Sequence, residues 1–288
     1  MHECDRPQSR DSRESALFSL ATILPFAASG DEGGTFHPPS IADFFPGPIL
    51  FEGTPFEFNR LQLVRVVAAV VLLVVFGLAA RRAKLVPGRF QNVIEFILDF
   101  VRINIATEIL GAKYGRKYTP MLTTLFCAVL AFNLTGIVPG LNIAGTSLIG
   151  LPLVLAVWVY VMYLASGVKA HGVGGFLKNS LFPPGVPVFL YVLLTPIEFL
   201  QVFILRPATL AIRLMANMVA GHLMLALCFS ATQFFLFSAG GGLKAFGVFT
   251  LAGGFAFLLF EVFVAALQAY VFAILTAVYV NLSVEAEH

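Results

Sequence analysis

Residues 61–80 read LQLVRVVAAVVLLVVFGLAA, a run in which Gln62 and Arg65 are the only strongly polar side chains. An α-helix needs about 20 apolar residues to cross the hydrocarbon core of a bilayer. The run therefore predicts a membrane-spanning helix over Leu61–Ala80. Arg65 stands near one end of it, where we expect its long side chain to reach the lipid headgroups.

The composition of the whole chain also indicates a membrane protein. Of the 288 residues, 58% are hydrophobic and 12% are charged, and the mean hydropathy is +0.88. An average soluble domain has roughly 45–50% apolar and ~25% charged residues. A soluble body could not cover this much apolar surface with so few charges. The net charge of +2 also excludes a large basic surface for nucleic acid.

Later apolar runs predict four more spanning helices. These runs are Pro120–Val138, Ser147–Ala165, Val186–Phe237 and Phe246–Leu282. The last two are longer than one perpendicular crossing requires, so each is either one strongly tilted helix or two short ones. Two short helices would need a turn inside the run, whereas Pro196 and Pro207 favour kinks. We therefore expect a long tilted hairpin, joined at the glycine-rich turn Ser238–Gly242.

Residues Arg89–Leu110 have a different pattern. Gln91, Glu95, Asp99 and Arg102 recur every three to four residues, opposite an apolar face. Such a helix is expected to lie on the membrane surface, and the alternative is a spanning helix whose polar stripe faces partners. The predicted fold is thus an all-α integral membrane protein with five transmembrane helices plus one interfacial amphipathic helix.

Charge sets the expected orientation. A basic cluster follows the first predicted span: Arg81, Arg82, Lys84 and Arg89. By the positive-inside rule this end lies in the cytoplasm, so residues 1–60 are extracytoplasmic and the C-terminus is cytoplasmic. Residues 61–288 form the membrane domain. Residues 1–29 end in an apolar run and small residues like those of a signal peptide, but acids precede that run. A cleaved signal and an interfacial tail both stay open.

Arg213 is the most informative ionisable residue in the predicted hairpin. Ionisable groups inside a membrane are costly and mark functional sites by default. An arginine cannot relieve that cost by losing its proton. Arg213 therefore needs an anion, supplied either by Glu261 on the neighbouring helix or transiently by another protein, and we favour the second.

A second group of polar residues surrounds His222 and Glu261. His222 follows Arg213 by nine residues, about 900° of helical rotation, so it faces the opposite way. Gln268 shares a helix face with Glu261, and Asn217 adds a second amide. Titratable groups with amides that hold water are the parts of a proton pathway. The alternative is a purely structural buried histidine.

Two segments resemble one known family. Residues 206–222 read RPATLAIRLMANMVAGH, and residues 267–279 read LQAYVFAILTAVY. The first resembles the signature of subunit a of the F-type ATP synthase, with its Arg-Leu, Asn-Met and Gly spacing. The second resembles the final helix of that family, and the resemblance extends over roughly residues 60–285.

The resemblance implies a proton-translocating stator subunit of the Fo sector. Arg213 would match the arginine that faces the rotating ring of c subunits. Asn217, His222, Glu261 and Gln268 would match the half-channel from the outside, and Glu198 is a candidate for the cytoplasmic half-channel. The implied partners are the c-ring, the subunit b stalk and the rest of the complex, in the plasma membrane.

The chain has no Walker motif, so we expect it not to make ATP itself, and we expect no cofactor. A secondary transporter is the main alternative, but it would need inverted repeats that are not apparent. An intramembrane enzyme with a metal at His222 and Glu261 would need a third ligand at suitable spacing, which is absent from the sequence.

Overall fold

The computed structural model describes residues 48–50, 58–82, 84, 88–138, 145–182, 188–238 and 244–284. The possible signal peptide and most of the turn Ser238–Gly242 lie outside these residues. The described part is mostly helical, with a short antiparallel pairing of β1 (Pro48–Leu50) with β2 (Phe58–Asn59). Four of its helices are long and apolar enough to cross a membrane, namely Arg60–Arg81, Gly150–Lys178, Tyr191–Phe237 and Lys244–Val284. The chain is therefore a multi-pass membrane protein.

Helix α2 (Arg60–Arg81) confirms the first predicted span to within one residue at each end. Most of its apolar surface is exposed, as expected for a helix that is apolar on all sides and faces lipid. Arg65 makes contacts within the protein that the sequence did not predict. Its Nε donates a hydrogen bond to the carbonyl of Gly145 at 2.8 Å, and its Nη2 donates to the carbonyl of Leu148 at 3.3 Å. Arg65 thus ties α2 to the segment that precedes α5.

The predicted amphipathic helix forms as α3 (Arg89–Val101) and its π-helical continuation η2 (Arg102–Thr107). Ile94 and Val101 are buried on one face, whereas Phe96 is exposed on another. The helix runs into α4 (Glu108–Leu134), whose backbone breaks at Gly111 with φ 69° and ψ 175°. A positive φ of this size is easily adopted only by glycine.

Helices α4 and α5 (Gly150–Leu181) differ from the predicted spans in their ends. Helix α4 stops at Leu134 rather than Val138, where the Thr135 hydroxyl bonds the carbonyl of Phe132 at 2.7 Å and competes with the helix. Helix α4 is not among the four candidate spans of the described residues. Helix α5 continues to Leu181, well past Ala165, where the predicted span ends. Its backbone breaks only at Gly172, with φ 73°.

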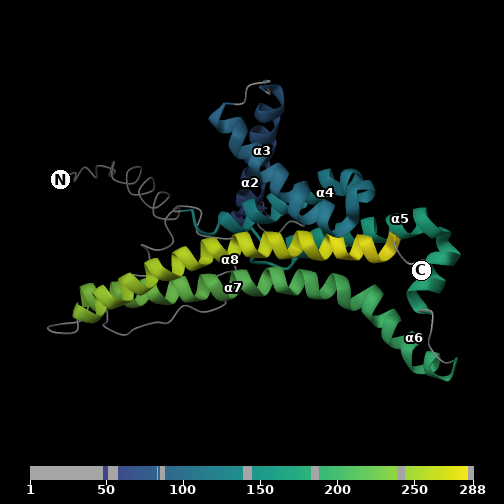
Figure 1. Ribbon diagram of the computed structural model, residues 1–288. Helices are drawn as coiled ribbons and strands as arrows, with labels where there is room; N and C mark the ends of the chain where they lie inside the picture. The colour runs from purple at the N-terminus through teal and green to yellow at the C-terminus, as the bar shows by residue number, and fades with distance from the viewer. Residues whose placement is uncertain are drawn as a thin grey trace, which may run out of the picture.

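The long run before the turn is a single kinked helix, as predicted. It comprises η3 (Val188–Leu190), α6 (Tyr191–Leu200), the π-helical η4 (Gln201–Leu205), α7 (Arg206–Gln233) and the π-helical η5 (Phe234–Ser238). The chain bends between α6 and α7 (Figure 1). A proline at 207 removes a backbone donor and crowds the carbonyl four residues earlier, which explains the shift to π geometry in the preceding turn.

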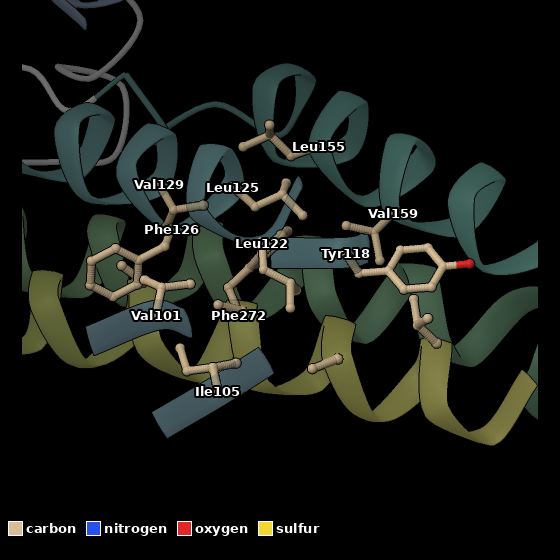
Figure 2. Close-up of a cluster of buried hydrophobic side chains, with 14 of the residues drawn as sticks. Val101, Ile105, Tyr118, Leu122, Leu125, Phe126, Val129, Leu155, Val159 and Phe272 are labelled. Carbon is tan, nitrogen blue, oxygen red and sulfur yellow. The ribbon is translucent and has the colours of Figure 1, made fainter. Parts of the chain in front are cut away.

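Helix α8 (Lys244–Val284) returns alongside α7 without interruption and completes the predicted hairpin (Figure 1). The core forms where α8 packs against α4 (Figure 2). Leu122, Leu125 and Val129 of α4 are fully buried there, beside Phe272 of α8. Ile105 of η2 belongs to the same cluster. Because this core holds only one side of the hairpin, the opposite side of α7 is left for other contacts.

Candidate functional site

His222 of α7 and Glu261 of α8 meet in the interface between the two arms of the hairpin. Their exposed fractions are 6% and 3%, and Nδ1 of His222 lies 3.4 Å from Oε1 of Glu261. Gly221 makes this approach possible. A Cβ atom at position 221 would lie 3.0 Å from Oε1 of Glu261, which is closer than ordinary contact. The glycine of the motif therefore provides the space for the carboxylate.

Asn217 and Gln268 form a second polar pair in the same interface. Nδ2 of Asn217 donates a hydrogen bond to Oε1 of Gln268 at 2.7 Å. Gln268 is 3% exposed, whereas Asn217 is exposed at the surface of α7. Along α8, Glu261 and Gln268 are seven residues apart, which is about 10 Å of helix rise. The two pairs thus follow one another along the interface, and Met218 and Ala265 pack in the buried layer between them.

Several buried polar atoms of this site make no hydrogen bond to protein. Within the described residues, neither oxygen of Glu261 accepts a hydrogen bond, and Nε2 of Gln268 donates none. Leaving such a group unsatisfied costs on the order of 1–3 kcal/mol. A carboxyl in this position can be satisfied by water or by taking up a proton. The geometry can therefore hold and pass protons.

Arg213 lies on the other side of α7. It is exposed, while Leu210, Ala211 and Leu214 around it are buried in the main core with residues of α4, α5 and α8. Across the part of the chain that the structure describes, Arg213 makes no hydrogen bond or ion pair. The alternative in which Arg213 pairs with Glu261 is not formed, because Glu261 contacts His222. The permanent cation of Arg213 is thus separated by the body of α7 from the buried His222, whereas Asn217 lies one turn along on the same exposed side as Arg213.

The structure does not bring Glu198 into this group. Glu198 is half-buried on α6, the segment that bends away from α8 (Figure 1). Its carboxylate makes no hydrogen bond or ion pair with any residue whose placement is described.

Arg206 has a clear role that the sequence did not reveal. Its Nη1 donates a hydrogen bond to the hydroxyl of Tyr163 at 3.1 Å. Its guanidinium carbon lies 5.4 Å from the ring centroids of both Tyr163 and Tyr279. Arg206 therefore links α7 to α5 and α8 by a hydrogen bond and two cation–π contacts. The partners come from distant segments, so sequence spacing could not identify them.

No group of three His, Cys, Asp or Glu side chains suited to a metal ion occurs in the described ranges. The fold and the site define a multi-pass helical membrane protein that carries titratable groups within its apolar helices. Proteins of this class use such groups to move ions or protons.

Comparison with known proteins identifies the family. The family model for the ATP synthase A chain matches residues 62–281. ATP synthase subunit a of Rhodococcus erythropolis is 50% identical over 88% of this chain and 92% of its own length. The proteins of the same name from Pseudarthrobacter chlorophenolicus and Parafrankia sp. are 36% and 39% identical, over 92% and 90% of this chain and 99% and 86% of their own lengths.

The chain belongs to the ATP synthase subunit a family. It is thus a non-catalytic, proton-translocating membrane subunit of the Fo sector, and its partners are the other subunits of the F-type ATP synthase. The sequence-based resemblance is confirmed.

Proposed function

We propose that the interface between α7 and α8 forms the half-channel that admits protons from outside. His222, Glu261, Asn217 and Gln268 carry this step. The unsatisfied oxygens of Glu261 support it, because a buried carboxyl without protein donors readily exchanges a proton with water or a neighbouring imidazole. The amide pair continues the polar line, and Asn217 reaches the exposed surface of α7.

Arg213 faces the ring of c subunits in this proposal. A proton that has passed the half-channel neutralises a carboxylate of the ring, and the neutral carboxyl can turn through lipid because burying it costs far less than burying its ion. When the carboxyl returns to Arg213, the fixed cation favours the ionised form and the proton leaves on the cytoplasmic side. Arg213 also blocks direct leakage between the two paths.

Glu198 belongs to the cytoplasmic half-channel. The position of Glu198 supports this assignment. Glu198 lies on α6, on the N-terminal side of Arg213, whereas His222 lies on the C-terminal side of Arg213 in α7. Because α6 bends away from α8, the carboxylate stands apart from the outer polar pairs, as two separate half-channels require.

The proposed topology has five spans: the four candidate helices named above and, in addition, α4. Helix α3 lies on the membrane surface. The apolar run of α4 after Pro120 supports its crossing, and the exposed charged residues Glu95, Asp99 and Arg102 support a surface location for α3. Residues 1–60 are outside the cell and the C-terminus is in the cytoplasm, with the protein in the plasma membrane. The basic residues after α2 support this orientation. Subunit b of the stalk binds the same membrane domain.

The observation that carries the proposal is the exposed, unpaired guanidinium of Arg213 on the face of α7 opposite the buried His222. Disulfide cross-linking tests it in a complex whose native cysteines are replaced. Ala216 is exposed on the Arg213 side, and Ala211 is 3% exposed on the buried side. We expect Ala216→Cys, but not Ala211→Cys, to cross-link to cysteines placed beside the carboxylate of the c subunit. Cross-linking from Ala211→Cys alone would show that the ring contacts the other face.

A further inference from the structure

A cavity of about 800 Å³ is lined by residues of α2, α3 and α4 and by none of the hairpin α7–α8. Helices α2 and α3 project away from α7 and α8 (Figure 1). The α2 wall is wholly apolar, and the α4 wall combines apolar residues with three threonines, Thr119, Thr123 and Thr124. Ala69, Leu72 and Phe76 line it from α2, and Ala128 and Phe132 line it from α4. A cavity of this size falls within the range of ligand-binding pockets, ~300–1,000 Å³. Nothing in the proton pathway uses it.

The third wall of the cavity is charged. Glu95, Asp99 and Arg102 line it from α3 and the start of η2. Oε1 of Glu95 accepts a hydrogen bond from Gln91 at 2.7 Å. The side chains of Asp99 and Arg102 make neither a hydrogen bond nor an ion pair within the described ranges. The wall therefore offers one cation and two anions, which is complementary to a headgroup that carries both a phosphate and an amine.

Thr123 adds an independent sign of a ligand. Its side chain lines the cavity and is only 5% exposed, and its hydroxyl has no hydrogen-bond partner among the described residues. Buried hydroxyls are nearly always hydrogen-bonded. An occupant with acceptor oxygens, such as the ester carbonyls of a phospholipid, would satisfy this donor.

The volume favours a slender molecule over a polypeptide helix. A helix that crosses a bilayer is ~30 Å long and at least ~10 Å wide, so its volume is about three times that of the cavity. Such a helix could insert only some of its side chains. An acyl chain fits whole between the apolar walls, and the amphipathic α3 would hold the headgroup at the membrane surface.

We propose that the cavity between α2, α3 and α4 binds one phospholipid with an amine headgroup, of the phosphatidylethanolamine type. The phosphate contacts Arg102, the ammonium contacts Asp99 and Glu95, and an acyl chain lies between α2 and α4. The net negative charge of the three side chains disfavours phosphatidylglycerol, which lacks the ammonium. The position of the headgroup rests on the proposed surface location of α3.

The test uses the complete synthase complex, purified from vesicles that contain equal amounts of phosphatidylethanolamine and phosphatidylglycerol. Native mass spectrometry after partial delipidation gives the ratio of the two retained lipids. We expect a two- to fivefold preference for phosphatidylethanolamine, the size of one partly exposed ion pair. Asp99→Asn should reduce the preference toward one. Ala128→Phe and, independently, Ala69→Phe should remove one bound lipid by filling the cavity.

Val71→Phe is the matched control, because Val71 is 54% exposed on α2 and does not line the cavity. It should leave the retained lipids unchanged. A photoreactive amino acid at position 73, which lines the cavity, should then cross-link to lipid. Equal retention of both lipids, retention unaffected by both filling variants, or a cross-link to another polypeptide would overturn the proposal. Because lipid retention is measured without proton flow, this test is separate from that of the proposed half-channels.

Discussion

Replacing Gly221 by alanine should slow proton passage, because the new methyl group would enter the space of the Glu261 carboxylate. The added Cβ would lie 3.0 Å from Oε1 and 3.3 Å from Cδ, whereas ordinary contact begins at 3.4 Å. The carboxyl group must therefore shift by about 0.4 Å in a site where Glu261 is only 3% exposed. Overpacking of this kind costs roughly 1–3 kcal/mol. If that cost falls on the step through Glu261, the rate falls about five- to 150-fold.

The assay is passive proton flux through membranes stripped of the catalytic head, normalised to the amount of assembled complex. Gly253→Ala is the matched control, since Gly253 lies in α8 of the same hairpin and a Cβ there would meet nothing within 4 Å. Its flux should stay near that of the unmodified protein. Combining Gly221→Ala with Glu261→Asp shortens the acid by one methylene group and should recover part of the flux. Normal flux in Gly221→Ala, or an equal loss in Gly253→Ala, would refute the steric reasoning.

Three further changes test other parts of the account. His222→Ala and Glu261→Ala should each slow proton passage, measured in the same flux assay, without uncoupling the complex. Exchanging the two residues, His222→Glu with Glu261→His, should restore part of the flux. If the exchanged variant is no better than the worse single variant, the two residues do not act together. Lys84→Cys in a cysteine-free background should react with impermeant thiol reagents only from the cytoplasmic side, and labelling of intact cells from outside would invert the topology. Tyr163→Phe removes the hydrogen bond to Arg206 and should destabilise the membrane domain by roughly 1.5–3 kcal/mol in thermal unfolding; an unchanged transition would contradict the link between α5 and α7.

The spanning helices could be predicted where a continuous stretch of sequence determines the helix. A bilayer demands a long apolar run, so the limits of α2 follow from residues 61–80 alone, and the kinked helix before the turn follows from its length and prolines. The end of α5 could not be predicted this way. The apolar run ends near Ala165, but helical geometry continues to a break at Gly172 that depends on backbone conformation.

The site was partly predictable for the same reason. Helical rotation alone separates Arg213 from His222, and the structure places them on exposed and buried faces of α7 as expected. The contact of His222 with Glu261 joins two arms of a hairpin, so its presence depended on the register between helices. The space at Gly221 had a sequence signal, since glycine stands in the motif directly before His222. The contacts of Arg65 and Arg206 could not be predicted from the sequence, because their partners lie far away in the chain.

The central claim is that Arg213 couples proton flow to rotation of the ring. The most direct measurement is ATP synthesis driven by an imposed proton gradient in membranes that carry the assembled Arg213→Ala complex. The account predicts that synthesis is abolished, and that Arg213→Lys also largely fails because an ammonium lacks the planar, weakly hydrated guanidinium. Synthesis at a normal rate in membranes with fully assembled Arg213→Ala complex would contradict the account.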